Sequence, residues 1–232
     1  AGTVLPNLAP AYSAATGVAV WNFDTGVANA YTLPAGELLR IVYRVQADAG
    51  LGAGLSMGNQ AQVQTYCSFD NNAVPALGSV IGVRQCYGPS NTATTTLLTA
   101  APNPLAKAIT QPTAVIGVPF RYRITIPATP QTVALYDVQV LDNLGASVAD
   151  LSYVSVTPVS GSAWTPVVSG APKNLVISGS GTGLDIAAGQ QAVFDVTVVL
   201  NDSATNVSGL SFQNSASYTY NQIDALVNPV PG

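Results

Sequence analysis

Histidine is absent from this chain of 232 residues, and charged residues make up only 8% of it. Without histidine the chain cannot build a Ser-His-Asp or Cys-His catalytic site, and it lacks the commonest pH switch. The net charge of −4 and the pI of about 4.4 offer no basic surface for nucleic acid or anionic lipid. We therefore expect no nucleic-acid partner, no cofactor and no enzyme acting on an external substrate.

Long apolar runs are also absent. No stretch approaches the roughly 18 consecutive apolar residues of a membrane helix, so we expect no membrane insertion. The sequence has no starting methionine and no signal peptide, which favours a mature product or a piece of a longer protein. Apolar residues still make up 48%, enough for a core, and the surface must be built largely from Ser, Thr, Asn, Gln and Gly. That composition is common in secreted β-proteins and fibres.

Cysteine occurs only twice, as Cys67 and Cys86. The two cysteines flank a segment rich in Gly, Pro and Asn, and strand-like sequence lies on either side. This pattern predicts a disulfide and hence an oxidising compartment. Two buried free thiols are the alternative. We expect no metal site here, because two cysteines without histidine fall short of the four ligands of zinc.

Alternating apolar and polar residues dominate the rest of the chain, and we find no convincing amphipathic helix. In residues 38–48, Leu39, Ile41, Tyr43 and Val45 form one face of an expected strand. Similar short strands recur at about ten-residue spacing between turn residues, which predicts an all-β fold of antiparallel sandwiches. The other main expected strands are 59–67, 92–100, 116–126, 133–142, 150–159, 174–179, 192–200 and 212–220.

An internal repeat relates the two halves of the chain. The matched pairs are Trp21 with Trp164, Gly36 with Gly189, Asp48 with Asp202, Leu55 with Leu210, and Asn59 with Asn214.

The first copy lacks a front half corresponding to residues 104–145. We therefore expect two domains, a partial sandwich at 1–100 with the disulfide loop and a complete one at 101–232 with a C-terminal tail. A sandwich that lacks its opening strands exposes unpaired edges, so neighbouring repeats or identical subunits are the expected partners. The tail 221–232 is one candidate donor strand, although its two prolines make it a poor central strand.

Four stretches, in this order, carry a resemblance to a known family: LAKAITQPTAVIGVPFRYRITIPA, VQVLDNLG, IAAGQ and LSFQNSASYTY. Together they resemble the conserved repeat domain of giant bacterial surface proteins, an isopeptide-forming fimbrial module related to pilin domains. The resemblance implies tandem immunoglobulin-like sandwiches in a stalk, fibre or adhesin on the bacterial cell surface. Two departures are IPATP, where the family has an asparagine, and Asp142-Asn143-Leu144, which lacks the usual proline.

The resemblance implies a crosslink between Lys107 and Asn214, with Asp142 as the acid. The residues themselves support it, since burial favours a neutral amine and a protonated carboxyl. The alternatives are that Lys107 is an edge lysine that blocks aggregation and that Asn214 is a satisfied amide. Asp137 and Asp195 are rival acids, which we expect on solvent faces.

The remaining lysine, Lys173, lies in a turn, where we expect it to be solvated. Asp48, Asp202 and Asp224 could help bind calcium at domain ends, but no spaced acidic loop accompanies them, so no metal is expected. The favoured function is structural, as part of an extracellular fibre, pilus-like filament or stalk. The alternative is an adhesin module that binds carbohydrate or protein on a host or surface receptor.

Overall fold

The computed structural model describes residues 9–23, 33–48, 50–67, 85–161, 163–181, 183–224 and 230–231. The loop between the cysteines and much of the expected donor tail lie outside these residues. The chain forms two compact units. The first is made of Ala1–Val45 and Gln60–Thr95, and the second of Gln46–Asn59 and Thr96–Gly232. The stretch 46–59 thus lies in the second unit although it precedes residue 100, and the division into two sandwich repeats stays a prediction.

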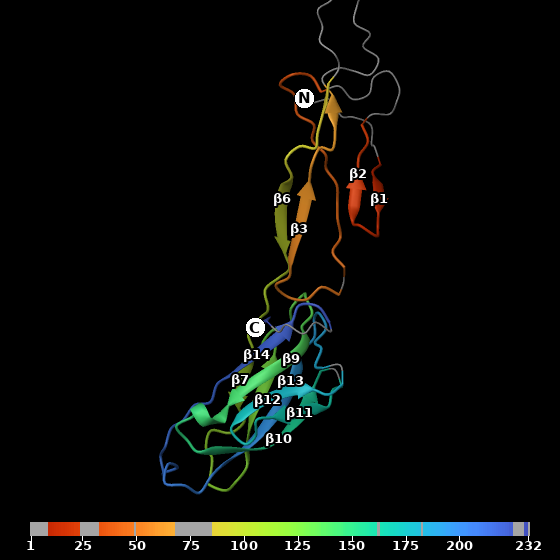
Figure 1. Cartoon of the computed structure of the whole chain (residues 1–232). Helices are drawn as coiled ribbons and strands as arrows, with labels where there is room; N and C mark the ends of the chain where they lie inside the picture. The colour runs from red at the N-terminus through yellow and green to blue at the C-terminus, as the bar shows by residue number, and fades with distance from the viewer. Residues whose placement is uncertain are drawn as a thin grey trace, which may run out of the picture. The chain divides into compact units, whose positions relative to one another are not determined.

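The described chain is nearly all β, which confirms the predicted fold class (Figure 1). Its one helical element among these residues is a single 3-10 turn, η1 (Leu144–Ala146), and no helix in the described part is long and apolar enough to cross a membrane. The strands are β1 (Ala11–Ser13), β2 (Val18–Val20), β3 (Ser56–Ala61), β4 (Tyr66–Cys67), β5 (Cys86–Tyr87), β6 (Ala93–Leu98), β7 (Ala106–Ile109), β8 (Phe120–Ile126), β9 (Tyr136–Asn143), β10 (Leu151–Ser160), β11 (Pro166–Ser169), β12 (Asn174–Gly179), β13 (Ala192–Leu200), β14 (Ala216–Asn221) and β15 (Val230–Pro231).

The second unit holds two antiparallel sheets with one hydrophobic core. One sheet has the strand order β10-β13-β8-β7, and the other has the order β11-β12-β9-β14-β15. Side chains of both sheets share the buried cluster, as expected of a sandwich. The core residues with no exposed surface include Ile124, Ile126, Leu135, Val138, Val140, Leu144, Leu151, Ile177, Phe194, Val196 and Val198.

Alternation along β8 explains why this strand belongs to the core. Phe120, Tyr122 and Ile124 are buried, whereas Arg121 and Arg123 between them are exposed. Successive strand residues point to opposite faces, so one face of β8 packs inward and the other meets solvent. Burying each large apolar side chain contributes roughly 1.5–3 kcal/mol.

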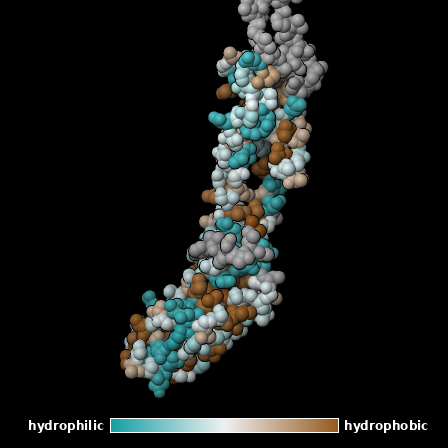
Figure 2. Space-filling model, viewed as in Figure 1, coloured by the Kyte–Doolittle hydropathy of each residue, from teal (hydrophilic) through white to brown (hydrophobic). Residues whose placement is uncertain are grey.

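The first unit is built differently. It contains the two-stranded ribbons β1–β2 and β4–β5, and the β3–β6 ribbon spans the boundary between the units. Large apolar residues of its described part lie on the surface (Figure 2), among them Leu38, Val42 and Val45.

The predicted strand at 38–48 is wrong for this structure, since none of these residues belongs to a strand. A strand needs a neighbour to pair with its backbone, and no described strand pairs with this stretch. The predicted strand at 59–67 is interrupted, with β3 ending at Ala61 and β4 beginning at Tyr66. The expected strands at 174–179 and 192–200 are present with the same ends, as β12 and β13, and the others are present with shifted ends. Strands β1, β2 and β11 were not predicted.

Two glycine turns that the repeat pairs with each other have the same geometry. The amide of Glu37 donates to the carbonyl of Pro34, and the amide of Gln190 donates to that of Ala187. The third residue of each turn is glycine, Gly36 with φ of 81° and Gly189 with φ of 78°. A positive φ at this position defines a type II turn, which glycine adopts without strain.

Candidate functional site

Lys107 lies on β7, the edge strand of the four-stranded sheet. It pairs with Ile124 of β8, while its neighbours Ala106 and Ala108 are exposed. The alternation turns the Lys107 side chain inward, where only 8% of it is exposed. Its Nζ atom lies 4.7 Å from the ring centroid of Tyr122. Lys107 is therefore a buried lysine, not a solvated edge lysine.

Asp142 lies on β9, the central strand of the facing sheet. It follows Val138 and Val140 on the inward face of that strand, and its side chain is 0% exposed. Its Oδ2 atom lies 2.7 Å from Nζ of Lys107. One ion pair thus joins the two sheets inside the core.

Asn214 reaches the same carboxylate from the segment before β14. Because Ala216 pairs with Asp142 across β9 and β14, Asn214 lies two residues from that pairing position. The Nδ2 atom of Asn214 donates to Oδ1 of Asp142 over 2.9 Å. The structure therefore places Lys107 and Asn214 on the two oxygens of one buried carboxylate.

The other amide atom of Asn214 has a different environment. Oδ1 of Asn214 is buried and has no hydrogen-bond partner among the described residues. An unpaired buried acceptor costs about 1–3 kcal/mol. The hydrogen bonds of the Asn214 side chain therefore do not fully explain why its amide is buried in this position.

Burial also sets the protonation chemistry of this site. It lowers the pKa of Lys107, and the charge of Asp142 and its hydrogen bond to Nζ oppose that effect only in part. Burial, with a further contribution from the charge of Asp142, raises the pKa of Tyr122 to about 12. The amine is thus easier to deprotonate than a solvated lysine, while the tyrosine beside it stays neutral.

The rival acids have other partners. Asp195 is buried and forms a double hydrogen bond with Arg123, with distances of 2.9 and 3.1 Å, on the outer face of β8 and β13. Asp137 accepts from Nδ2 of Asn221 at 2.7 Å. Asp195 lies on the outer face, as expected, but it is buried there because the arginine covers it.

Lys173 forms an ion pair with Asp150, which corrects the expectation of a merely solvated side chain. Asp150 belongs to a network that the sequence did not reveal. Asn206 is buried, its Oδ1 accepts from the amide of Asp150 at 2.9 Å, and its Nδ2 donates to the carbonyls of Asp150 and Asn201. The network fastens the loop after β13 to the start of β10.

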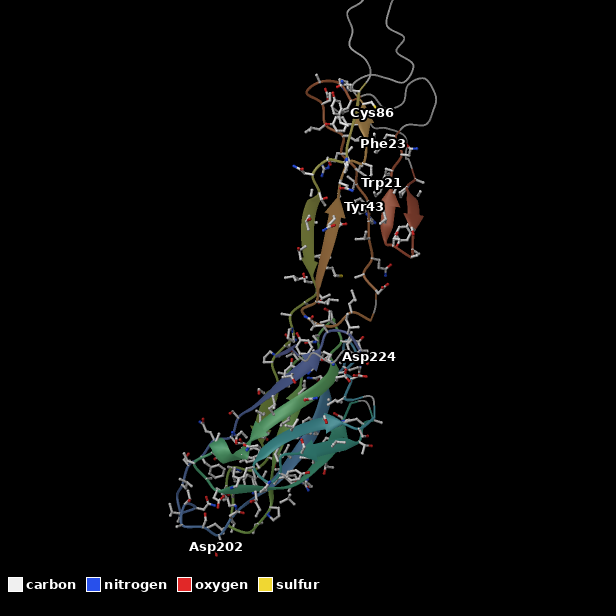
Figure 3. The ribbon with its side chains drawn as sticks, in the orientation of Figure 1. Trp21, Phe23, Tyr43, Cys86, Asp202 and Asp224 are labelled. Atoms are coloured by element: carbon white, nitrogen blue, oxygen red, sulfur yellow. A yellow bond between two sulfur atoms is a disulfide. The ribbon has the colours of Figure 1, made fainter. Side chains whose placement is uncertain are left out.

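Three carboxylates gather elsewhere in the second unit. One oxygen from each of Asp137, Asp185 and Asp224 lies within 4.8 Å of the others. Burial raises the pKa of Asp185, and the charges of Asp224 and Asp137 add to that effect. Asp224 and Asp202 lie at opposite ends of this unit (Figure 3), so the acids considered from the sequence do not form one site.

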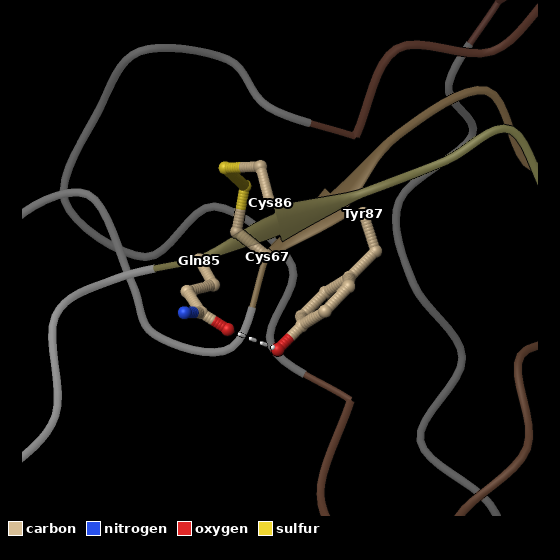
Figure 4. Close-up of a disulfide and its surroundings, with 4 residues drawn as sticks. All are labelled: Cys67, Gln85, Cys86 and Tyr87. Carbon is tan, nitrogen blue, oxygen red and sulfur yellow. Dashed lines mark hydrogen bonds between the residues drawn. A yellow bond between two sulfur atoms is a disulfide. The ribbon is translucent and has the colours of Figure 1, made fainter.

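The predicted disulfide between Cys67 and Cys86 is confirmed (Figure 4). The two cysteines are direct partners in the β4–β5 ribbon, with Cα atoms 4.0 Å apart. Next to them, the rings of Tyr66 and Tyr87 stack with centroids 5.4 Å apart. Closing a loop of this size stabilises by about 3 kcal/mol on the chain-entropy account.

No family model matches the sequence, and no curated protein matches it. Among solved structures, a similar chain is the collagen-binding domain of the surface protein RspB of Erysipelothrix rhusiopathiae, with a TM-score of 0.35 and 15% sequence identity. The match covers 80% of this chain and 55% of that chain, so this chain spans about half of its length. At this level of similarity the match carries no argument about function.

Proposed function

We propose that the chain is a structural module of an extracellular bacterial surface fibre or stalk, and that an isopeptide bond between Lys107 and Asn214 locks its second unit. One observation carries the proposal: a single buried carboxylate, that of Asp142, contacts both the amine and the amide. The disulfide and the scarcity of charge suit a secreted protein. The fibre context comes from the family resemblance of the sequence.

The reaction begins with a proton transfer. The ammonium of Lys107 gives a proton to Oδ2 of Asp142, 2.7 Å away, which leaves a neutral amine and a neutral carboxyl. Burial favours this neutral pair because it disfavours both charged forms. The lowered pKa of Lys107 acts in the same direction.

Bond formation then takes place at the side-chain carbon of Asn214. The lone pair of the Lys107 amine attacks Cγ, a new C–N bond forms, the bond from Cγ to Nδ2 breaks, and ammonia leaves. Protonated Asp142 donates a hydrogen bond to the amide oxygen as negative charge develops there. It then gives its proton to the leaving nitrogen and takes the proton that the attacking nitrogen loses, so the carboxyl group is regenerated and ammonia is released. Holding the two groups in contact makes the step effectively unimolecular.

The unpaired Oδ1 atom of Asn214 fits this scheme. While Asp142 is ionised it can only accept, so Nδ2 faces it and Oδ1 has no partner. Once Asp142 is protonated on Oδ2, half-turns of both the carboxyl and the amide bring the new donor to Oδ1 of Asn214. Proton transfer followed by these rotations would satisfy the buried oxygen and polarise the carbonyl.

The bond would tie the edge strand β7 of one sheet to the segment before β14 of the other. A crosslink that closes a loop of about 100 residues stabilises by roughly 4–5 kcal/mol on the chain-entropy account. It would also stop the first and last core strands of the unit from separating under tension. This is the property that a load-bearing stalk requires.

Intact mass under denaturing conditions, after reduction of the disulfide, tests the proposal. The wild-type chain should be about 17 Da lighter than its sequence mass, because the condensation releases ammonia. Asp142→Ala should have the full sequence mass. Asp195→Ala is the matched control, since it removes an acid of the same sandwich that contacts neither Lys107 nor Asn214, and it should retain the deficit. A wild-type chain of full mass would refute the crosslink.

A further inference from the structure

Residues 38–45 of the first unit and strand β13 of the second carry the same pattern. Both follow the glycine turns described above, and the alignment of Gly36 with Gly189 fixes their register. In this register the first four of the five inward-facing residues of β13 correspond to four apolar residues of the first unit. The pairs are Leu39 with Ala192, Ile41 with Phe194, Tyr43 with Val196, and Val45 with Val198.

The two sets differ in burial. In β13, Phe194, Val196 and Val198 are 0% exposed, because β8 and β10 flank the strand and the second sheet covers it. In the first unit, Ile41 is 42% exposed and Val45 is 78% exposed. The apolar face of a central strand is thus present in residues 38–45, without the covering that this face has in β13.

Each unit also has an aromatic contact between its repeat tryptophan and the inward set, although the two contacts lie at different positions of this register. The rings of Trp21 and Tyr43 lie 5.2 Å apart (Figure 3). Those of Trp164 and Phe194 lie 5.4 Å apart. In each unit the tryptophan of the repeat packs on an aromatic residue from the inward set. Leu39, Ile41 and Tyr43 are still 42%, 42% and 45% exposed.

The charged residues on the opposite face of residues 38–45 indicate which charge a strand that pairs with this stretch should carry. In the second unit the acid is on β13, where Asp195 pairs with Arg123 of β8. In residues 38–45 the matching face carries Arg40 and Arg44, with Val42 at the position of Asp195. The distribution of charge is reversed, so the strand that pairs with this stretch should be acidic.

The same charges argue against a second copy of this chain. Antiparallel pairing of two copies centred on Val42 would place Arg40 opposite Arg44. Strand β8 of another copy fits no better, because its Arg121 pairs with Thr197, the position that corresponds to Arg44. Like charges directly opposite each other destabilise a pair of strands.

The geometry points to residues 38–45 as a docking edge for an extended segment that alternates apolar residues with aspartate or glutamate. The segment adds as a strand, with backbone hydrogen bonds for affinity and side chains for selection. Its apolar residues cover Leu39, Ile41 and Tyr43, and its acids face Arg40 and Arg44. The inference does not depend on the proposed crosslink.

The test uses the full chain and two nine-residue peptides. One alternates valine with glutamate, and the other alternates valine with lysine. Amide hydrogen exchange at residues 38–45 reports docking. The glutamate peptide should protect these residues from exchange. It should also bind at least about fivefold more tightly than the lysine peptide, because it forms two favourable cross-strand pairs with Arg40 and Arg44 where the lysine peptide forms two unfavourable ones. The net charge of −4 would by itself favour the lysine peptide, so nonspecific attraction cannot give this result.

Two variants give the controls. Arg40→Glu with Arg44→Glu should reverse the preference, whereas Arg121→Glu, a charge reversal on the outer face of β8, should leave it unchanged. Equal affinity for both peptides, or a preference of the wild type for lysine, would overturn the inference. So would protection of residues 38–45 in the chain alone through self-association, or the failure of the glutamate peptide to bind.

Discussion

Nζ of Lys107, on the edge strand of one sheet, lies 2.7 Å from Oδ2 of Asp142, on the central strand of the other. Both side chains are almost wholly removed from solvent, at 8% and 0% exposure. A buried ion pair rarely adds net stability, because desolvation offsets the attraction between the charges. Asn214 contacts the second oxygen of Asp142, and the proposed chemical role of the pair rests on this contact.

Breaking this pair from one side should be costly. Lys107→Met removes the amine and leaves Asp142 as an uncompensated buried charge, which lowers the free energy of unfolding by about 3–5 kcal/mol. The same variant also removes the stabilisation of the proposed crosslink. Chemical denaturation followed by the fluorescence of Trp164 measures the change, because this residue packs against the core of the second unit.

The double variant Lys107→Met with Asp142→Leu is the matched control for that experiment. It removes both charges and fills the space with apolar atoms, so it should recover much of the loss relative to the single variant. If the single and double variants were equally unstable, the buried charge would not be the cause.

The hydrogen bonds of Asn206 should contribute more to stability than the position of this residue in a surface loop suggests. Asn206→Ala removes three hydrogen bonds to the backbone of Asp150 and Asn201, and the expected loss is roughly 2–4 kcal/mol. Ser208→Ala, which changes an exposed neighbour in the same loop, should change stability by less than about 0.5 kcal/mol. Thermal melting of the two variants compares them, and similar melting points would show that the network contributes little.

Two buried tyrosines should make the second unit sensitive to strong alkali. Burial raises the pKa of Tyr122 to about 12, with a further contribution from Asp142, and burial raises that of Tyr218 to about 12, with a contribution from Tyr220. The folded state holds these protons more tightly than the unfolded state, whose tyrosines titrate near 10. Their contribution to stability is therefore complete below about pH 10 and is lost as the pH rises through about 12.

Phenolate absorbance after a rapid pH jump measures this directly. At pH 11 both tyrosines should remain protonated while the chain is folded, and Tyr122→Phe should remove one late-titrating group. Titration of all tyrosines in a single step near their ordinary pKa would contradict the predicted burial effect.

The alternation of apolar and polar residues was enough to predict most strands of the second unit. The alternation in β8 and β13 is strong because one face of each strand is wholly buried. The same kind of pattern gave a wrong prediction at residues 38–48. Alternation shows that one face of a segment is suited to burial, but it does not show that another strand pairs with the segment. The sequence also pointed to Lys107, Asp142 and Asn214 through the family resemblance, and the structure places them in contact, although their crosslinking stays a prediction.

Contacts between distant residues could not be predicted in this way. The sequence around Tyr122 indicates only a core residue of an alternating strand. It does not show that the charged group of Lys107 lies over the tyrosine ring. The bond between Asp150 and Asn206 spans 56 residues and depends on how the loop after β13 folds back. Asp195 looked solvent-facing because the arginine that covers it lies on another strand.

Tryptic digestion after reduction tests the central claim most directly, because an acylated lysine is not cleaved. If Lys107 and Asn214 are joined, peptide 85–121 should appear with Lys107 uncleaved and attached through its side chain to peptide 174–232. Fragmentation of this branched species should place the bond at the two named residues. Free peptides 85–107 and 174–232 in place of the branched species would contradict the account and leave Lys107 as a buried ion-pair residue only.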